Sequence, residues 1–357
     1  MSDTTTSGDR RFRASGETLS EVVTEQDLSV NAPDVIPPKV GGTPVVGRSP
    51  GQLAWMRIKR DRVAVVSAIV LAFFALLAVF APVISWLYGS KVYTGNNELM
   101  DLRGRPLGVA GGISGSHWLG ITPQRGYDVF LQLIFGVRTS LGIALVAAIL
   151  ATAFGIVVGI TAGYLGGWVD RVLSWFIDVM LCFPFFLFAL AVVPTLSTRL
   201  GDQYGAVAPW KRVLMLISIF VIFGWMYVAR LVRGQVISLR EREYVEAARA
   251  AGAGTGHILF KQVLPNIWAP ILVAFSLQVP AIVTAEAALA IFGIGITEDT
   301  QIADLGRLIY DSIAYLSVSG LAPGAVYLPG VVIFALVLSF NLLGDSLRDA
   351  LDPKSLQ

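Results

Sequence analysis

Residues 243–266 read EYVEAARAAGAGTGHILFKQVLPN, between the apolar stretches RVLMLISIFVIFGWMYVA and IWAPILVAFSLQVPAIV. Alanines and alternating charges in the first half of this segment predict a short helix. Gly252 is predicted to end that helix, because glycine commonly follows a helix C-terminus. Thr255 is predicted to cap a second short helix, which Pro265 closes or kinks. A charged helix, a tight turn and another helix thus interrupt a very hydrophobic chain.

The composition indicates that lipid is the solvent for most of the chain. Its 357 residues are 55% apolar and 15% charged, whereas a soluble domain carries about 25% charged residues. The net charge of +2 is too small to indicate nucleic acid as a partner. The single cysteine, Cys182, excludes a disulfide within the chain. No secretory signal is expected at the N-terminus.

Long apolar runs predict the fold class. Each run is long enough to cross a hydrocarbon core about 30 Å thick as a helix. The alternating ten-residue pattern of a membrane barrel is not found. We therefore expect an all-α polytopic membrane protein with six transmembrane helices. The predicted spans are 63–87, 138–163, 172–194, 213–232, 267–292 and 326–344.

The other segments divide into a tail, a lead-in and loops. Residues 1–50 are rich in Ser, Thr, Gly, Pro and acids and lack apolar periodicity, so we expect a disordered tail. A basic amphipathic lead-in over 51–62 precedes a six-helix domain over 63–353. Within that domain, we expect a long loop over 88–137 on one side of the membrane and a loop over 233–266 on the other.

The distribution of basic residues predicts the orientation. About two thirds of the 27 Lys and Arg residues lie on the side of the N-terminal tail, and that side is expected to be cytoplasmic. Both termini are then cytoplasmic, and so is the segment 243–266. The loop 88–137 is predicted to lie outside.

Six positions of the opening segment share a distinctive spacing: Glu246, Ala247, Ala248, Gly252, Leu264 and Pro265. The spacing resembles the EAA loop of ABC-importer permeases, although Gln262 stands where that loop usually has isoleucine. In that family the loop contains a coupling helix that docks in a cleft on the ATPase subunit. The resemblance implies that the residues coupling this chain to an ATPase are Tyr244, Glu246, Ala247, Ala248, Arg249, Gly252, Ala253, Gly254 and Thr255.

Further stretches are similar to the second permease subunit of dipeptide/oligopeptide/nickel importers. They include AEAALAIFGIG at 285–295, NLLGDSLRDALDP at 341–353 and the glycine-rich run at 136–170, and the similarity covers about residues 55–353. It implies a type I ABC-importer permease fold and peptide import by alternating access across the cytoplasmic (inner) membrane of a prokaryote. The implied partners are a second homologous permease, two ATP-binding subunits or domains, and an extracytoplasmic substrate-binding protein. The sequence does not decide whether the substrate is a dipeptide, a longer peptide or another small solute.

Two outer stretches depart from the family pattern. The stretch HWLGITPQRGYD is one residue longer than usual but keeps His117, Gly120, Gly126 and Asp128. A Leu305-Gly306 pair replaces the usual Trp-Gly. We expect both departures on the outer side, where a substrate-binding protein docks.

The sequence contains no phosphate loop of the form Gly-x-x-x-x-Gly-Lys-Ser/Thr. ATP hydrolysis is therefore assigned to partner subunits, and no enzyme activity, cofactor or metal is expected in this chain. His117 and His257 are predicted on opposite sides of the membrane, so they cannot share a metal. We expect His257 at the surface and His117 in loop packing.

Ionisable residues within apolar runs must face protein or water, because lipid makes them costly. Asp178 is expected to have a structural partner such as Arg171. Glu286 has two readings. It either pins the following FGIG turn by a hydrogen bond or acts as an outer-gate acid that meets the peptide's amino terminus.

Small residues recur every four positions in the second span, at Ala151, Gly155, Gly159 and Gly163. Such a stripe predicts close helix packing. Its partner is either another helix of this chain or the second permease.

An ion-coupled secondary transporter is the alternative function. It would explain six spans and buried acids, and it predicts internal repeats and carboxylates in the middle of broken spans. No convincing repeat is found, and this alternative does not account for the segment 243–266.

Overall fold

The computed structural model describes residues 50–108, 110–202, 207–296, 301–315 and 322–351. All of them belong to one unit of the chain that begins at Arg48. Within these residues the regular structure is helical, apart from two isolated β-bridges. The predicted tail lies outside the described residues except for Pro50.

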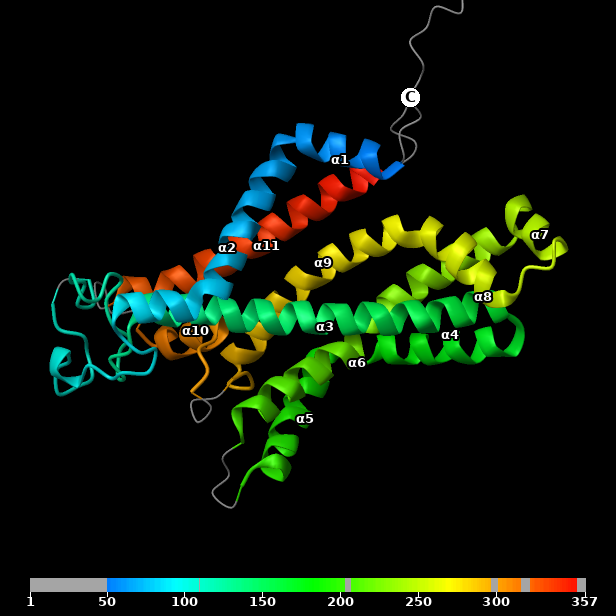
Figure 1. Ribbon diagram of the computed structural model, residues 1–357. Helices are drawn as coiled ribbons and strands as arrows, with labels where there is room; N and C mark the ends of the chain where they lie inside the picture. Colours follow the sequence, from blue (N-terminus) through cyan, green and yellow to red (C-terminus); the bar gives the residue numbers. More distant parts are fainter. Residues whose placement is uncertain (1–49, 109, 203–206, 297–300, 316–321, 352–357) are drawn as a thin grey trace, which may run out of the picture. The chain divides into compact units, whose positions relative to one another are not determined.

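Figure 1 shows the helices in sequence colours. Five are long and apolar enough to cross a membrane, or six if the bent pair α4 and α5 forms one span. The predicted all-α polytopic class is confirmed. The helices are α1 (Pro50–Arg60), α2 (Arg62–Tyr88), α3 (Val129–Leu165), α4 (Gly167–Cys182), α5 (Phe185–Leu200), α6 (Pro209–Arg240), α7 (Glu243–Ala250), α8 (Thr255–His257), a π-helical stretch (Ile258–Val263), α9 (Leu264–Ile291), α10 (Leu305–Ile313) and α11 (Pro323–Leu351).

The predicted third span, 172–194, is broken. Helices α4 and α5 meet at an 80° bend. Phe183 is extended, with φ −71° and ψ 124°, and Pro184 stands at the N-cap of α5. Proline lacks an N–H group and pushes the residue before it out of helical geometry. The span predicted over 172–194 is therefore two helices, α4 and α5, and not one uninterrupted helix.

Two predicted loop boundaries also differ from the structure. Helix α3 begins at Val129, because the side chain of Asp128 caps it, so the long loop ends nine residues before its predicted end at 137. Helix α6 continues to Arg240, into the predicted loop 233–266. At the far end of that loop, α8, the π-helical stretch and α9 form one helical run, Thr255–Ile291.

The small-residue stripe of α3 packs against α6. A Cβ atom at Gly159 would lie 2.6 Å from the Ala229 carbonyl oxygen, and one at Gly155 would lie 2.7 Å from the Trp225 oxygen. Real Cβ atoms do not come this close, so only glycine lets the two backbones touch. Of the two partners considered for the stripe, the structure shows the one within the chain.

Ion pairs join α4 to α6. Arg233 Nη2 donates to Asp170 Oδ2 at 2.8 Å, and Arg230 pairs with Asp178. Asp178 thus has a structural partner, as expected, but the partner is Arg230 and not Arg171, the example named from the sequence. Arg171 is seven residues away on the same helix, which is about 10 Å along the axis. The side chain across the helix interface is the nearer cation.

The start of the described chain lies beside the end of α11 (Figure 1). Asp61 caps α2 by accepting from the Val63 N–H at 2.9 Å, and it accepts from the Ser346 hydroxyl at 2.6 Å. The hydrogen bond from Ser346 holds the pKa of Asp61 below its usual value. Arg57 Nη1 also donates to the Ala350 carbonyl oxygen at 3.3 Å. The two ends of the membrane domain therefore lie on the same side.

We expect Gly159→Ala to destabilise the protein, because its Cβ would meet backbone that cannot move without separating α3 from α6. Overpacking of this kind costs about 1–3 kcal/mol. Thermal unfolding of the detergent-purified complex measures the effect. Gly142→Ala, on the same helix with nothing within 4 Å of the added Cβ, is the matched control and should be neutral or stabilising. Equal unfolding temperatures for the two variants would contradict the proposed contact.

Candidate functional site

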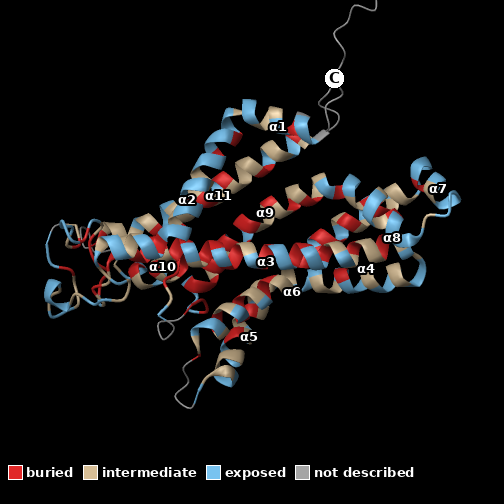
Figure 2. Cartoon of the chain, in the orientation of Figure 1, coloured by how far each residue is buried: buried red, intermediate tan, exposed pale blue. Residues whose placement is uncertain are grey.

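Helix α7 is held to the rest of the chain by one buried side chain. Val245 is completely buried and packs in a cluster with Val236 of α6 and with Ile258 and Val263 of the π-helical stretch. Figure 2 shows α7 largely in the colour of exposed residues. Ala248 is partly exposed, and the exposed candidate residues of this helix are Tyr244, Glu246, Ala247 and Arg249. Nearly all of α7 is therefore available to a partner.

The C-terminus of α7 ends as the sequence predicts. Gly252 has a φ of +85°, the left-handed region in which glycine is strongly favoured. Its N–H donates to the Arg249 carbonyl at 3.0 Å, and the Ala253 N–H donates to the Ala248 carbonyl at 3.0 Å. These two bonds form a Schellman motif. The prediction that Gly252 ends the helix is confirmed.

The joint after α7 differs from the prediction. Gly254 is the N-cap residue of α8 and no side chain makes a capping bond, whereas Thr255 was expected to be the cap. Pro265 lies just after the π-helical stretch Ile258–Val263, and the helical run continues past it. The run from Thr255 therefore continues into α9 through a π-helical stretch, a geometry frequent at functional sites. His257 is exposed, as expected.

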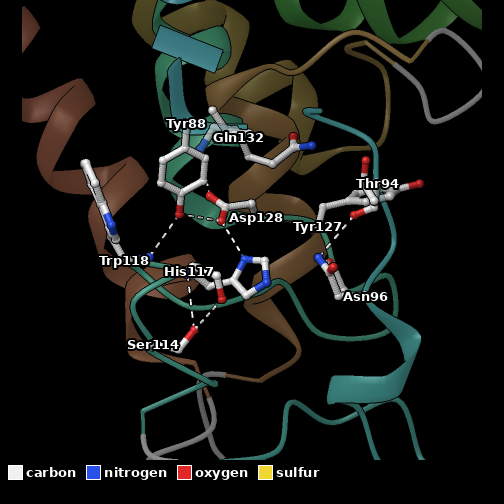
Figure 3. Close-up of polar contacts among 12 residues, drawn as sticks. Tyr88, Thr94, Asn96, Ser114, His117, Trp118, Tyr127, Asp128 and Gln132 are labelled. Atoms are coloured by element: carbon white, nitrogen blue, oxygen red, sulfur yellow. Dashed lines mark hydrogen bonds and ion pairs between the residues drawn. The ribbon is translucent and has the colours of Figure 1, made fainter. Parts of the chain in front are cut away.

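The loop 89–128 joins the end of α2 to the start of α3. A polar network fixes this loop in place (Figure 3). Asp128 caps α3 by accepting from the Leu131 N–H at 3.0 Å. Its Oδ2 accepts from the Tyr88 hydroxyl at 2.9 Å and lies 2.8 Å from His117 Nδ1. His117 is 7% exposed and Asp128 is 1% exposed. The structure places His117 in loop packing, as the sequence analysis expected.

Two glycines of the same stretch let the loop fold tightly. Gly120 has a φ of +79°, and a Cβ there would lie 2.4 Å from the Gly111 oxygen. Gly126 has a φ of +65°, and a Cβ there would lie 2.8 Å from the Asn96 nitrogen. The residues of HWLGITPQRGYD that match the family pattern therefore pack inside this loop.

The Leu305-Gly306 pair lies inside the protein. Leu305 is completely buried, and a Cβ at Gly136 of α3 would lie 3.0 Å from its Cδ2 atom. A Cβ at Gly306 would lie 2.6 Å from the Ala290 Cβ atom. We expected this departure on the outer side, where a substrate-binding protein docks, but the pair is buried and forms no exposed docking surface. The pair packs α10 against α3 and α9.

Glu286 is buried in α9 and is 1% exposed. Asp304 and Ser140, each also 1% exposed, lie beside it, and the Ser140 hydroxyl donates to Asp304 Oδ1 at 2.8 Å. The Glu286 carboxyl lies within hydrogen-bonding reach of the Asp304 and Ser140 side chains, although no described donor is aligned with either of its oxygens. No hydrogen bond from Glu286 to the FGIG turn is found among the described residues. The described structure does not test the outer-gate role, and Glu286→Gln does.

The sequence analysis missed Arg138. It took residue 138 as the first of a span and so did not count it among the ionisable residues within spans. Helix α3 begins nine residues earlier, at Val129, which places Arg138 inside the span. The apolar run VFLQLIFGV at 129–137 was the signal that could have shown this.

We expect Glu286→Gln to leave assembly and uptake intact. Two buried carboxyl groups side by side, those of Glu286 and Asp304, are costly when both are charged, and an amide of the same shape at residue 286 removes one charge and can still donate to Asp304. Thermal unfolding of the complex and uptake by whole cells measure the two properties. Glu286→Ala is the matched comparison and should destabilise, since it leaves a cavity. Normal assembly of Glu286→Gln combined with lost uptake would instead support the outer-gate acid.

Comparison with known proteins identifies the family. Residues 155–357 match the family described as binding-protein-dependent transport system inner membrane component, and residues 49–100 match the N-terminal TM domain of oligopeptide transport permease C. A solved chain of the MetNI methionine ABC transporter, titled as inward facing, has a TM-score of 0.48 at 20% identity, covering 62% of this chain and 97% of that chain.

Three curated relatives match most of the chain. The dipeptide transport system permease protein DppC of Alkalihalophilus pseudofirmus is 36% identical, covering 92% of this chain and 96% of the relative. The glutathione transport system permease protein GsiD of Pectobacterium atrosepticum is 32% identical, covering 86% and 92%. The oligopeptide transport system permease protein OppC of Bacillus subtilis is 31% identical, covering 84% and 88%. The chain therefore belongs to the family of binding-protein-dependent transport system inner membrane components, which confirms the resemblance seen in its sequence.

Proposed function

We propose that this chain is one of the two permease subunits of an ATP-driven ABC importer that moves di- or oligopeptides by alternating access. The relatives named for dipeptide, oligopeptide and glutathione transport support a peptide substrate. Membership of the importer family weighs against the ion-coupled alternative. ATP is hydrolysed by separate partner subunits.

The observation that carries the coupling role is the exposure of α7. A helix that contributes one buried residue, Val245, to the core gives the fold little stability of its own. Its exposed face combines small side chains with Tyr244 and Arg249, so another surface can approach closely and still make directional contacts. Helices of this kind bind in grooves of partner proteins. We assign α7 and the joint through Thr255 as the ATPase contact.

Movement of α7 has two helical routes into the membrane domain. Val245 packs against Val236, which lies near the end of α6, and against Ile258, which leads into α9. The run Thr255–Ile291 is helical throughout. Displacement of α7 by an ATPase would therefore move α6 and α9 together, as alternating access requires.

Each side of the membrane domain is assigned its own partners. We place α7 and both termini in the cytoplasm of a prokaryote, with the protein in its inner membrane. The contact of Asp61 with Ser346 supports this, because it puts both ends of the membrane domain on one side. The loop 89–128 then faces an extracytoplasmic substrate-binding protein. A second homologous permease completes the pathway, and two ATP-binding subunits or domains complete the importer.

We expect Ala248→Trp and Gly252→Val to abolish substrate-stimulated ATP hydrolysis while leaving the protein in the membrane. Tryptophan adds bulk on the docking face, and valine resists the left-handed backbone at Gly252. ATPase activity of the reconstituted complex with its binding protein and a dipeptide is the readout. Gly330→Val and Gly330→Trp, on α11 with nothing within 4 Å of the added Cβ, are the controls. Normal stimulation in both α7 variants would overturn the coupling assignment.

The substrate class has its own test. Cells that lack this chain should lose uptake of labelled dipeptides and regain it when the chain is restored. Unchanged dipeptide uptake in the deleted strain, with other peptide importers also removed, would refute the peptide substrate.

A further inference from the structure

A cavity of about 890 Å³ opens between the start of the loop 89–128, α3, α6 and the segment before α10. This volume lies within the usual range for small-molecule sites, roughly 300–1,000 Å³. Much of its wall is apolar, but two cations line it. The lining residues that matter here are Lys91, Arg138, Phe135, Ile143, Val213 and Ile217.

Arg138 is unusual for a residue of a membrane-spanning helix. It lies nine residues into α3, about 14 Å along the axis, and its side chain is exposed. No ion pair or hydrogen bond joins its guanidinium to another described residue. A guanidinium stays charged at all physiological pH values, so it must face water or an anion.

Two other cations near the same ends of the helices are engaged. The guanidinium of Arg307 binds Asp311, and the ammonium of Lys211 donates to the Leu200 carbonyl oxygen at 3.2 Å. Lys91, by contrast, is exposed, and no hydrogen bond or ion pair joins its ammonium to the described part of the chain. The cavity therefore gathers two cations whose counter-charge the described structure does not supply.

The chemistry of the cavity matches one end of a peptide. Peptides of varied sequence share only their backbone and their two termini, so a site that accepts many of them must read those groups. A guanidinium binds a carboxylate through two parallel hydrogen bonds. An apolar wall formed by side chains such as Phe135, Ile143 and Ile217 accepts varied apolar groups without directional demands.

We propose that Arg138, assisted by Lys91, binds the C-terminal carboxylate of the transported peptide inside this cavity. The proposal rests on the proposed peptide-import function and adds a substrate site to it. Val213 and Ile217 belong to α6, the helix whose other end contacts α7 through Val236. Helix α6 thus contributes both to the wall of the site and to the contact with α7. Docking of the ATPase on α7 can therefore move the wall and change how the carboxylate is held.

The first test is uptake by the complete transporter with its binding protein. Arg138→Gln should raise the dipeptide concentration needed for half-maximal uptake by roughly tenfold, as loss of a charged bidentate pair would. Arg138→Lys should recover part of this, since it keeps the charge. Arg199→Gln removes an exposed cation at the end of α5, outside the cavity, and serves as the control. Equal uptake by Arg138→Gln and wild type would overturn the proposal.

The second test measures occupancy without the binding protein. Gly142 lines the cavity with nothing within 4 Å of an added Cβ, so Gly142→Cys is expected to fold normally. The exposed native thiol is removed by Cys182→Ser. A millimolar dipeptide should slow maleimide labelling of the new cysteine, the same dipeptide amidated at its C-terminus should not, and Arg138→Gln should abolish the protection.

Each other outcome has a definite meaning. Equal protection by the acid and the amide, or no protection, would overturn the carboxylate site. Labelling that responds only to replacing phosphatidylglycerol with phosphatidylcholine in the vesicles would assign Arg138 to lipid headgroups and also overturn it. Failure of the wild type to take up any dipeptide would refute the peptide function itself, whereas normal uptake without protection refutes only this site.

Discussion

The contact between the backbones of α3 and α6 is the constraint on which the other helices depend. Lipid offers no hydrophobic drive for helices to associate, so small residues that allow close packing decide which pairs form. Because α3 and α6 lie so close, Gln278 of α9 reaches both of them. It accepts from the Thr152 hydroxyl of α3 at 3.1 Å and donates to the Gly224 carbonyl of α6 at 3.1 Å. Asp170 of α4 joins the same pair through Arg233. A movement of α6 must therefore carry α3, α4 and α9 with it or break these contacts.

The sequence predicted the features that depend on local chemistry. Apolar runs indicate spans wherever lipid is the solvent, and Gly252 indicates a helix end because few other residues accept its backbone geometry. Boundaries failed where local signals compete. An apolar run before residue 138 was taken for loop, and Phe183-Pro184 was taken for the interior of a span. Thr255 is a good capping residue in isolation, but Gly254 occupies the cap because the helix starts one residue earlier than predicted, at Thr255 itself.

Contacts between distant residues could not be predicted in the same way. Arg230 and Asp178 are 52 positions apart, and Ser140 and Asp304 are 164 positions apart. Which of several polar residues meet depends on how each helix is rotated and which helix lies beside it, and composition does not record either. Glu286 shows the limit clearly. Its burial follows from the cost of charge in lipid, but its neighbours follow only from the packing of α10 on α9.

The single anchor of α7 has an evolutionary consequence. Because Val245 alone ties the helix to the core, most of its positions face outward, and substitutions at such positions usually change stability little. Under the proposed coupling role, selection can alter which ATPase binds at Tyr244 or Arg249 without destabilising the membrane domain. Duplicated importers in one cell would then come to use separate ATPases, or the same one, through substitutions within the eight residues of α7.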